Sequence, residues 1–157
     1  MTALFLPHEH ATLALAEQFS GCLKKFRLPE NGLTLYLDGD LGAGKTTFVR
    51  GLLRSLGFSG SVKSPTYSLL EEYHLSCGLT IQHFDLYRFS TPEEWADAGF
   101  DDLEINAIRL IEWADKGGDF VPPPDIRLAL SVEQSGRNAV FTAHTLTGEN
   151  FLSLWQA

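Results

Sequence analysis

The sequence is poor in cysteine and has no long apolar run. Cys22 and Cys77 are the only cysteines among its 157 residues, and their spacing fits neither a C-x-x-C motif nor a metal site. We therefore expect two reduced thiols, buried or partly buried, in a cytoplasmic protein. No apolar stretch approaches the ~20 residues that a membrane-spanning helix needs. Residues 1–7 also lack the basic start of a signal peptide, so the sequence predicts no contact with membranes.

Basic residues are scarce as well. The chain has 12 Lys and Arg against 20 Asp and Glu, which gives a formal net charge of −8. Residues 85–119 hold ten acidic and three basic side chains, so most of the negative charge is concentrated there. Gripping a nucleic-acid backbone needs clustered Lys and Arg, which argues against nucleic-acid binding by this chain alone. The acidic segment is either a solvated face or a docking surface for a basic partner.

The composition is that of a folded protein. Hydrophobic residues make up 44% and aromatic residues 11%, enough to bury a core, and 157 residues is the usual size of one domain, here 1–157. Hydrophobic spacing and turn residues predict helices over 8–26, 45–56 and 91–99, and strands over 33–37, 67–73, 79–85, 108–112, 126–132 and 139–146. This alternation predicts an α/β fold, whose mixed sheet has a parallel core and a C-terminal antiparallel hairpin around residues 134–137.

The strongest motif is a phosphate loop. Residues 39–46 read GDLGAGKT and fit the pattern G-x-x-x-x-G-K-[ST] in full, between a predicted strand and a predicted helix. That arrangement is typical of a three-layer, P-loop NTPase-like fold, because backbone N–H groups and the helix dipole then surround a phosphate. Lys45 can reach the β- and γ-phosphates, and the Thr46 hydroxyl can ligate Mg²⁺. We predict that ATP or ADP is held by the loop residues Leu41, Gly42, Ala43, Gly44, Lys45, Thr46 and Thr47.

Two acidic residues end predicted strands. Hydrolysis at a phosphate loop needs a further carboxylate to hold Mg²⁺ or to position the attacking water. Asp85 and Glu112 are the candidates, because ligands of an open α/β sheet lie beyond the carboxyl ends of its strands. On the residues alone, each fits such a role as well as it fits a cap or a surface ion pair.

Three further features carry less information. The loop Ser64-Pro65-Thr66-Tyr67 is either a nucleotide-sensing switch or an ordinary loop before a strand. Trp113 either stacks on a base or fills the core. His83 is interpreted as a structural residue, since the sequence shows no nucleophile or metal pattern around it.

Four blocks of the sequence together support a resemblance. Residues 38–51, 62–67, 83–88 and 112–113 read DGDLGAGKTTFVRG, VKSPTY, HFDLYR and EW. In this order and spacing they closely resemble the TsaE (YjeE) family, the bacterial ATPases of tRNA threonylcarbamoyladenosine biosynthesis. The resemblance covers most of the chain, and the combination is far more specific than a phosphate loop alone.

The resemblance implies a small P-loop ATPase that works with the proteins TsaD and TsaB. In that system TsaD with TsaB transfers a threonylcarbamoyl group to an adenosine of tRNA. The TsaE-like subunit binds their heterodimer and hydrolyses ATP to sustain turnover, so it meets tRNA only through the complex. We expect low intrinsic activity, because no arginine finger is evident in the chain and a partner would complete the site.

The resemblance also implies roles for single residues. Catalysis falls to Lys45, Asp85 and Glu112, and the Mg²⁺ ligands come from Thr46, Glu112 and Asp85, with Glu112 favoured as the direct ligand. Beyond the phosphate loop, nucleotide contacts are implied for Glu9, Trp113, Gly136 and Arg137.

Two other functions stay open. A small P-loop kinase would phosphorylate a metabolite, but it often needs a cationic lid, and the arginines after the phosphate loop are scattered. A nucleotide-sensing binding module would use the nucleotide only as a conformational ligand, and it would not need two candidate carboxylates.

Overall fold

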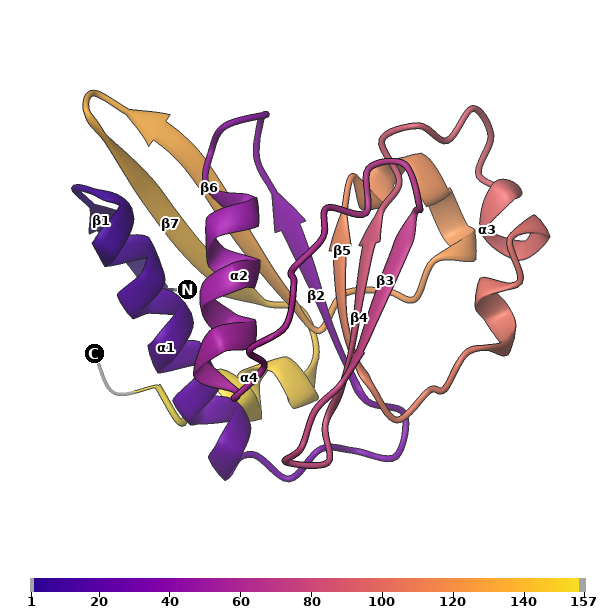
Figure 1. Cartoon of the computed structure of the whole chain (residues 1–157), viewed down its shortest axis with the longest axis horizontal. Helices are drawn as coiled ribbons and strands as arrows, with labels where there is room; N and C mark the ends of the chain where they lie inside the picture. The colour runs from indigo at the N-terminus through magenta and orange to yellow at the C-terminus, as the bar shows by residue number, and fades with distance from the viewer. Residues whose placement is uncertain (1, 156–157) are drawn as a thin grey trace.

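The computed structural model describes residues 2–155, which form a seven-stranded mixed sheet flanked by helices (Figure 1). The elements in chain order are β1 (Thr2–Leu6), α1 (Glu9–Lys25), β2 (Leu33–Asp38), α2 (Lys45–Ser55), β3 (Leu70–His74), β4 (Thr80–Asp85), α3 (Glu94–Asp97), the 3-10 segment η1 (Phe100–Asp102), β5 (Ile108–Glu112), the 3-10 segment η2 (Ala114–Phe120), β6 (Ile126–Glu133), β7 (Gly136–Ala143) and α4 (Leu146–Leu152). Across the sheet the strand order is β1-β7-β6-β2-β5-β4-β3.

The centre of the sheet is parallel. Strands β6, β2, β5 and β4 are parallel neighbours, whereas β1 with β7, β6 with β7, and β3 with β4 pair antiparallel. The central strand β2 is buried from Leu33 to Leu37, as expected where both faces of a sheet are covered. The predicted α/β fold, with its parallel core and C-terminal hairpin, is confirmed. The carboxyl ends of β2, β4 and β5 consequently meet at one edge.

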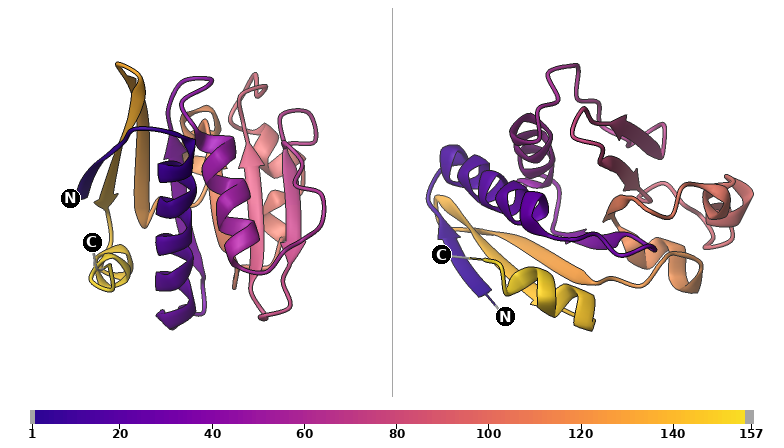
Figure 2. Two further views of the ribbon diagram at one scale, coloured as in Figure 1. Left: turned by 60° about the vertical axis from the view of Figure 1, so that its left-hand side comes forward. Right: turned by 90° about the horizontal axis from the view of Figure 1, so that it is seen from below.

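Helices α1 and α2 cover one face of the sheet (Figure 2). Both are amphipathic, and the ring of Phe19 in α1 lies 5.7 Å from the ring of Phe48 in α2. Gly51 lets the two helices approach closely, because a Cβ there would stand 3.0 Å from the Cβ of Ala16. Each large apolar side chain buried in this layer contributes roughly 1.5–3 kcal/mol to folding. This packing fixes the first turn of α2 beneath the phosphate loop.

A second apolar cluster lies on the opposite face. Tyr36 of β2 and Ile111 of β5 alternate with neighbours that point toward α1 and α2, so each strand serves both clusters. The ring of Trp95 in α3 lies 4.8 Å from that of Phe84, and Phe100 of η1 packs on both. Together the two clusters give the three layers that the sequence predicts.

The structure corrects the bounds of several predicted elements. The strand predicted over 67–73 begins only at Leu70, because Leu69 is left-handed (φ 70°) and its N–H donates to Pro65 O in a turn. The strand predicted to reach residue 146 ends at Ala143, where the Thr145 side chain caps α4. The helix predicted over 91–99 is reduced to α3, although the Glu94 carboxylate accepts from the N–H of Thr91 as a capping box requires. Strand β1, helix α4 and the 3-10 segments η1 and η2 are not predicted from the sequence.

The two cysteines are free, as predicted, but they differ in exposure. Cys22 is buried in α1, whereas Cys77 is exposed in the turn between β3 and β4 and corrects the expectation of a buried or partly buried thiol. Burial raises the pKa of the Cys22 thiol, although the charge of Lys25 partly opposes this. Between residues 2 and 155, no helix has the length and apolar character needed to cross a membrane.

Candidate functional site

The phosphate loop joins the end of β2 to the start of α2. Gly39 passes so close to β6 that a Cβ there would lie 2.5 Å from Leu130 O, and Gly44 has the left-handed φ of 109° that favours glycine. Gly44 is also the N-cap of α2 and makes no side-chain cap hydrogen bond. The first N–H groups of α2 therefore remain available to an anion at the positive end of the helix dipole.

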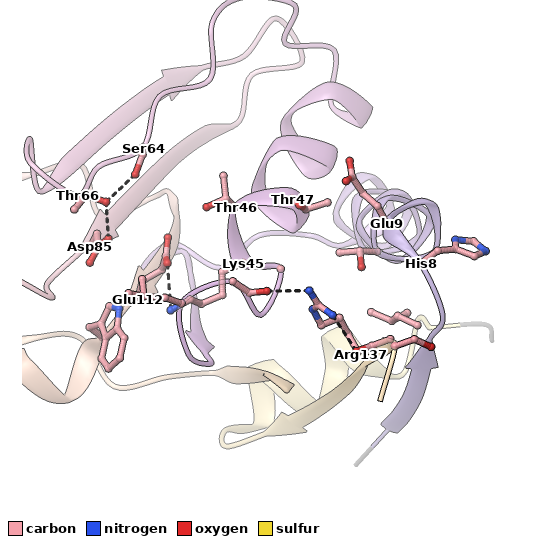
Figure 3. A pocket seen from close by; sticks show the side chains of 18 residues that line it. His8, Glu9, Lys45, Thr46, Thr47, Ser64, Thr66, Asp85, Glu112 and Arg137 are labelled. Carbon is pink, nitrogen blue, oxygen red and sulfur yellow. Dashed lines mark hydrogen bonds and ion pairs between the residues drawn. The ribbon is translucent and has the colours of Figure 1, made fainter. Parts of the chain in front are cut away.

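A cavity of about 360 Å³ opens over this loop (Figure 3). It is bounded by the phosphate loop, the loop after α2, the ends of β4 and β5, the start of α1 and the β6–β7 turn. The lining residues are Leu6, His8, Glu9, Thr12, Leu41, Gly42, Gly44, Lys45, Thr46, Thr47, Ser64, Thr66, Asp85, Glu112, Trp113, Ser135, Gly136 and Arg137. The volume falls in the usual range for sites that bind small molecules.

Lys45 lies at the floor of the cavity and is only 6% exposed. Its Nζ donates to Gly39 O at 2.6 Å and stands 3.5 Å from Glu112 Oε1. The same ammonium lies 4.7 Å from the centroid of the Trp113 ring, a cation–π distance. The cation is thus held at the base of the phosphate loop by an acceptor, a carboxylate and an aromatic face.

Glu112 ends β5 and is buried beside Lys45. Its Oε2 lies 2.6 Å from His83 Nε2, and its Oε1 is the atom that faces Lys45. Burial desolvates the carboxylate and raises its pKa, but the hydrogen bond and positive field of His83, and then those of Lys45, outweigh burial. The pKa of Glu112 therefore lies below its ordinary value of 4.5. The site holds a buried carboxylate that is ionised at neutral pH.

Asp85 ends β4 directly beside Glu112, its partner in the parallel register. Its Oδ1 accepts from the N–H of Tyr87 at 3.0 Å, and its Oδ2 accepts from the Thr66 hydroxyl at 3.3 Å. The Thr66 hydroxyl also lies 2.8 Å from the hydroxyl of Ser64, so that a chain of hydrogen bonds links the loop after α2 to Asp85 (Figure 3). The loop with the switch-like sequence is thus tied to a carboxylate in the cavity.

The opposite wall of the cavity is formed by residues near the N-terminus and by the turn between β6 and β7. The Arg137 guanidinium donates to Gly42 O at 3.1 Å and to Gly136 O at 3.0 Å. A Cβ at Gly136 would lie 2.6 Å from Leu6 O, so glycine lets the hairpin turn approach the end of β1. Glu9 lies at the start of α1, where its Oε1 pairs with Arg50 Nη2 at 3.3 Å. The wall is therefore built by the end of β1, the start of α1 and the turn between β6 and β7, segments that are distant in sequence.

The structure brings nearly all of the sequence-predicted residues to this cavity. Those that line it are Glu9, Leu41, Gly42, Gly44, Lys45, Thr46, Thr47, Asp85, Glu112, Trp113, Gly136 and Arg137. Ala43 does not line it, because its side chain is buried in the core and its N–H donates to Asp40 O at 3.1 Å. Sequence reasoning missed four lining residues, Leu6, His8, Thr12 and Ser135. Only the neighbourhood of Glu9 and Gly136 could have indicated them.

The two residues with ambiguous sequence signals take different places. Trp113 lines the cavity and also packs on the second apolar cluster, so it partly fills the core, while its stacking on a base stays a prediction. Its backbone is left-handed, with φ 57°, which turns the chain sharply after β5. His83 is buried outside the cavity and pairs with Glu112, which lines it.

The donor set at the cavity fits a magnesium ion. The Thr46 hydroxyl and the carboxylates of Asp85 and Glu112 are hard oxygen ligands, and all three side chains line the same space as the phosphate loop. Mg²⁺ in nucleotide sites uses one or two such carboxylates together with phosphate oxygens and water. These residues are therefore suited to a metal that enters with a nucleotide.

The sequence is similar to those of known proteins. Residues 6–139 match the family model described as "Threonylcarbamoyl adenosine biosynthesis protein TsaE". The tRNA threonylcarbamoyladenosine biosynthesis protein TsaE of Haemophilus influenzae is 42% identical over 150 residues, which cover 95% of this chain and 94% of the relative. The protein of the same name from Bacillus subtilis is 37% identical over 116 residues, which cover 71% and 70%.

A solved structure shares the fold. The crystal structure of YdiB from Bacillus subtilis superposes with a TM-score of 0.74 at 27% sequence identity. The match covers 97% of this chain and 91% of the YdiB chain.

Proposed function

The chain belongs to the TsaE family, and we propose that in tRNA threonylcarbamoyladenosine biosynthesis it is the subunit that binds and hydrolyses MgATP. We further propose that it does so together with the proteins TsaD and TsaB, whose threonylcarbamoyl transfer to tRNA the hydrolysis sustains. Low activity of the chain alone and its stimulation by that pair are parts of the same proposal.

The observation that carries the proposal is the convergence of three charged side chains on one cavity. Lys45, Asp85 and Glu112 come from three different segments, yet all line the space over the phosphate loop at the carboxyl ends of β2, β4 and β5. Ligands of open α/β sheets bind at this edge. A binding module would need the loop and its lysine, whereas two ionisable carboxylates beside them suit hydrolysis better.

The chain's own residues divide the chemistry among them. The N–H groups at the start of α2 and the Lys45 ammonium bind the phosphates. The metal ligands come from Thr46 and one or both of Glu112 and Asp85, with Glu112 favoured as the direct ligand. Bound Mg²⁺ would neutralise charge on the β- and γ-phosphates. The carboxylate that is not a direct ligand orients the attacking water. The guanidinium of Arg137 lies on the opposite wall and donates to Gly42 O of the phosphate loop.

The charge of the molecule supports a partner-dependent role. With a net charge of −8 the chain is a poor ligand for a tRNA backbone, so contact with tRNA falls to the partners. The loop from Ser64 to Thr66 is bonded to Asp85 and lies at the rim of the cavity. A partner that contacts this loop would act directly on a carboxylate of the site.

The first test measures phosphate release from MgATP by the chain alone and with TsaD and TsaB. We expect stimulation by the pair, together with multi-turnover threonylcarbamoyl transfer to tRNA. Lys45→Ala should weaken nucleotide binding about ten- to a hundredfold, because a hydrogen bond to a charged group is worth about 1.5–3 kcal/mol. Its hydrolysis should fall to background.

Lys25→Ala is the matched control, because it removes the same charge from the far end of α1, away from the cavity. It should bind and hydrolyse ATP as the wild type does. Hydrolysis by Lys45→Ala at the wild-type rate would contradict the assignment of the phosphate loop. Transfer of the phosphoryl group to a metabolite, without stimulation by TsaD and TsaB, would favour a kinase instead.

A further inference from the structure

A buried imidazole lies directly behind the site. His83 is in β4, two residues before Asp85, and its side chain is 3% exposed. It does not line the cavity, yet its Nε2 is 2.6 Å from Glu112 Oε2. An ionised carboxylate can only accept hydrogen bonds, so Nε2 carries the proton and donates.

The pairing follows from the register of two parallel strands. Asp85 lies opposite Glu112, and His83 lies opposite Leu110, so His83 and Glu112 are diagonal neighbours. Residues two apart on a strand point to the same face, and diagonal neighbours are within reach of long side chains. The sheet therefore places the imidazole against the carboxylate without help from any loop.

The other ring nitrogen shows that packing alone does not favour histidine here. His83 Nδ1 is buried and has no hydrogen-bond partner within residues 2–155. An unsatisfied buried polar atom costs about 1–3 kcal/mol, which an apolar side chain of similar size would avoid. The position faces the apolar cluster that contains Leu110 and Ile81. Within residues 2–155, the contact with Glu112 is thus the one polar interaction that distinguishes imidazole from an aliphatic residue at this place.

We propose that His83 is a positioning residue for Glu112. Its Nε2–H fixes Oε2, and this leaves Oε1 directed at Lys45 and the cavity. Without the imidazole the carboxylate can rotate about its side-chain torsions, and Lys45 alone, at 3.5 Å, does not define one orientation. Groups that orient ligands or catalytic side chains in this way typically change activity or metal affinity ten- to a hundredfold when removed. The inference rests on the proposed function, in which Glu112 serves hydrolysis.

Kinetics with three variants test the role. His83→Leu should lower kcat about ten- to a hundredfold while nucleotide affinity changes little, because the phosphate loop is untouched. His83→Gln should recover part of the loss, since its amide N–H can still donate to Glu112. Gln82→Leu is the control for disturbance of β4, because Gln82 is equally buried but does not line the cavity. Its kcat should equal that of the wild type. A wild-type kcat in His83→Leu overturns the proposal.

A double-mutant cycle shows whether His83 acts through Glu112. In a Glu112→Gln background, the further change His83→Leu should leave the residual rate unchanged, because the side chain that it orients is already altered. If His83→Leu reduces the rate by the same factor in both backgrounds, the two residues act independently. That result would refute a positioning role.

A spectroscopic measurement gives an answer without nucleotide or turnover. Nitrogen NMR of the histidine rings should reveal one Nε2-bound proton that exchanges slowly, is absent in His83→Gln, and shifts in Glu112→Ala. No shift in Glu112→Ala would mean that the pair does not form, and the proposal would fail. If the wild type hydrolyses no ATP even with TsaD and TsaB, the proposed function fails, and the NMR result decides the pairing on its own.

Discussion

Glu112 is a buried carboxylate that keeps its negative charge. An isolated ion in this place would be strongly disfavoured, because burial removes its hydration. His83 and Lys45 each offer an N–H donor to a different oxygen, and together they hold the pKa of Glu112 below its ordinary value. The contacts that keep Glu112 ionised therefore also contribute to the stability of the fold.

The free energy of unfolding of the chain should therefore depend on pH through the carboxyl of Glu112. The pKa of its carboxyl is lower in the folded chain than the ordinary 4.5, so the unfolded chain binds the proton more readily in this range. The contribution is fully present at neutral pH. It should be lost as the pH falls from about 5 through the lowered pKa, because protonation then favours unfolding.

Urea unfolding of the wild type and Glu112→Gln at several pH values measures this effect. The glutamine variant has no proton to gain, so its free energy of unfolding should fall less steeply in acid. The difference between the two proteins should shrink as the pH drops below about 5. If the free energy of unfolding changes with pH in parallel for the two proteins, Glu112 has the same pKa in the folded and the unfolded chain.

At the scale of elements, the contact between α1 and α2 is set by a glycine. Gly51 leaves little room for a side chain, because a Cβ would stand 3.0 Å from both Ala16 Cβ and Leu13 Cδ2, closer than an ordinary contact. Both helices reach the cavity at their first residues, α1 with Glu9 and α2 with Lys45. The distance between the helices thus affects the core and the site together.

Two glycine substitutions should change stability in opposite directions. Gly51→Val overfills the contact between the helices and should lower the free energy of unfolding by about 1–3 kcal/mol. Gly21→Ala, within α1, meets no atom within 4 Å and should raise it by about 0.5–1 kcal/mol, because alanine favours the helix. Urea unfolding followed by circular dichroism measures both. Equal effects of the two substitutions would show that the helix contact is not tightly packed.

The elements that sequence predicts well are those with local signals. The phosphate loop, β2 and α2 follow from glycine spacing and apolar periodicity, and the structure reproduces them within one residue at most ends. Strand β1 is held by pairing with β7, across most of the chain, and no local pattern reveals such a partner. Helix α4 depends on Thr145, whose hydroxyl donates to Asp125 of a distant loop while it caps the helix.

The same distinction applies to the site. Residues of the phosphate loop, Asp85 and Glu112 can be assigned from motifs and strand ends, while Glu9 and Arg137 came from a family resemblance. The contact of His83 with Glu112 depends on the register between β4 and β5, which the sequence of either strand leaves open. Leu6 and Thr12 line the cavity because the pairing of β1 with β7 brings the end of β1 and the start of α1 to the hairpin turn at Gly136.

The two apolar clusters of the whole molecule share the same strands. Leu35 and Leu37 of β2 face the first cluster, and Tyr36 between them faces the second. In β5, Leu110 and Ile111 divide in the same way. Neither cluster can lose its packing without disturbing the central parallel strands. The molecule should therefore unfold as one cooperative unit.

Tryptophans on the two sides of the sheet make this expectation measurable. Trp95 lies 4.8 Å from Phe84 in the second cluster, and Trp155 lies 5.2 Å from Phe141 at the first. Two variants, each with one of these tryptophans retained and the others replaced by phenylalanine, report on one side each. In both, the urea midpoint from fluorescence should coincide with the midpoint from far-ultraviolet circular dichroism, as a two-state transition requires.

The fluorescence and circular dichroism midpoints are measured on the same variant. Any effect of the tryptophan substitutions on stability therefore shifts both midpoints equally. A fluorescence midpoint for Trp95 below the circular dichroism midpoint would show that the layer of α3, η1 and η2 opens first. That layer packs on the sheet at Tyr36 and Ile111, and Ile111 is the residue before Glu112 in β5. Early opening would then loosen the end of β5 that carries Glu112. Coincident midpoints mean that the site and the rest of the fold are lost in the same transition.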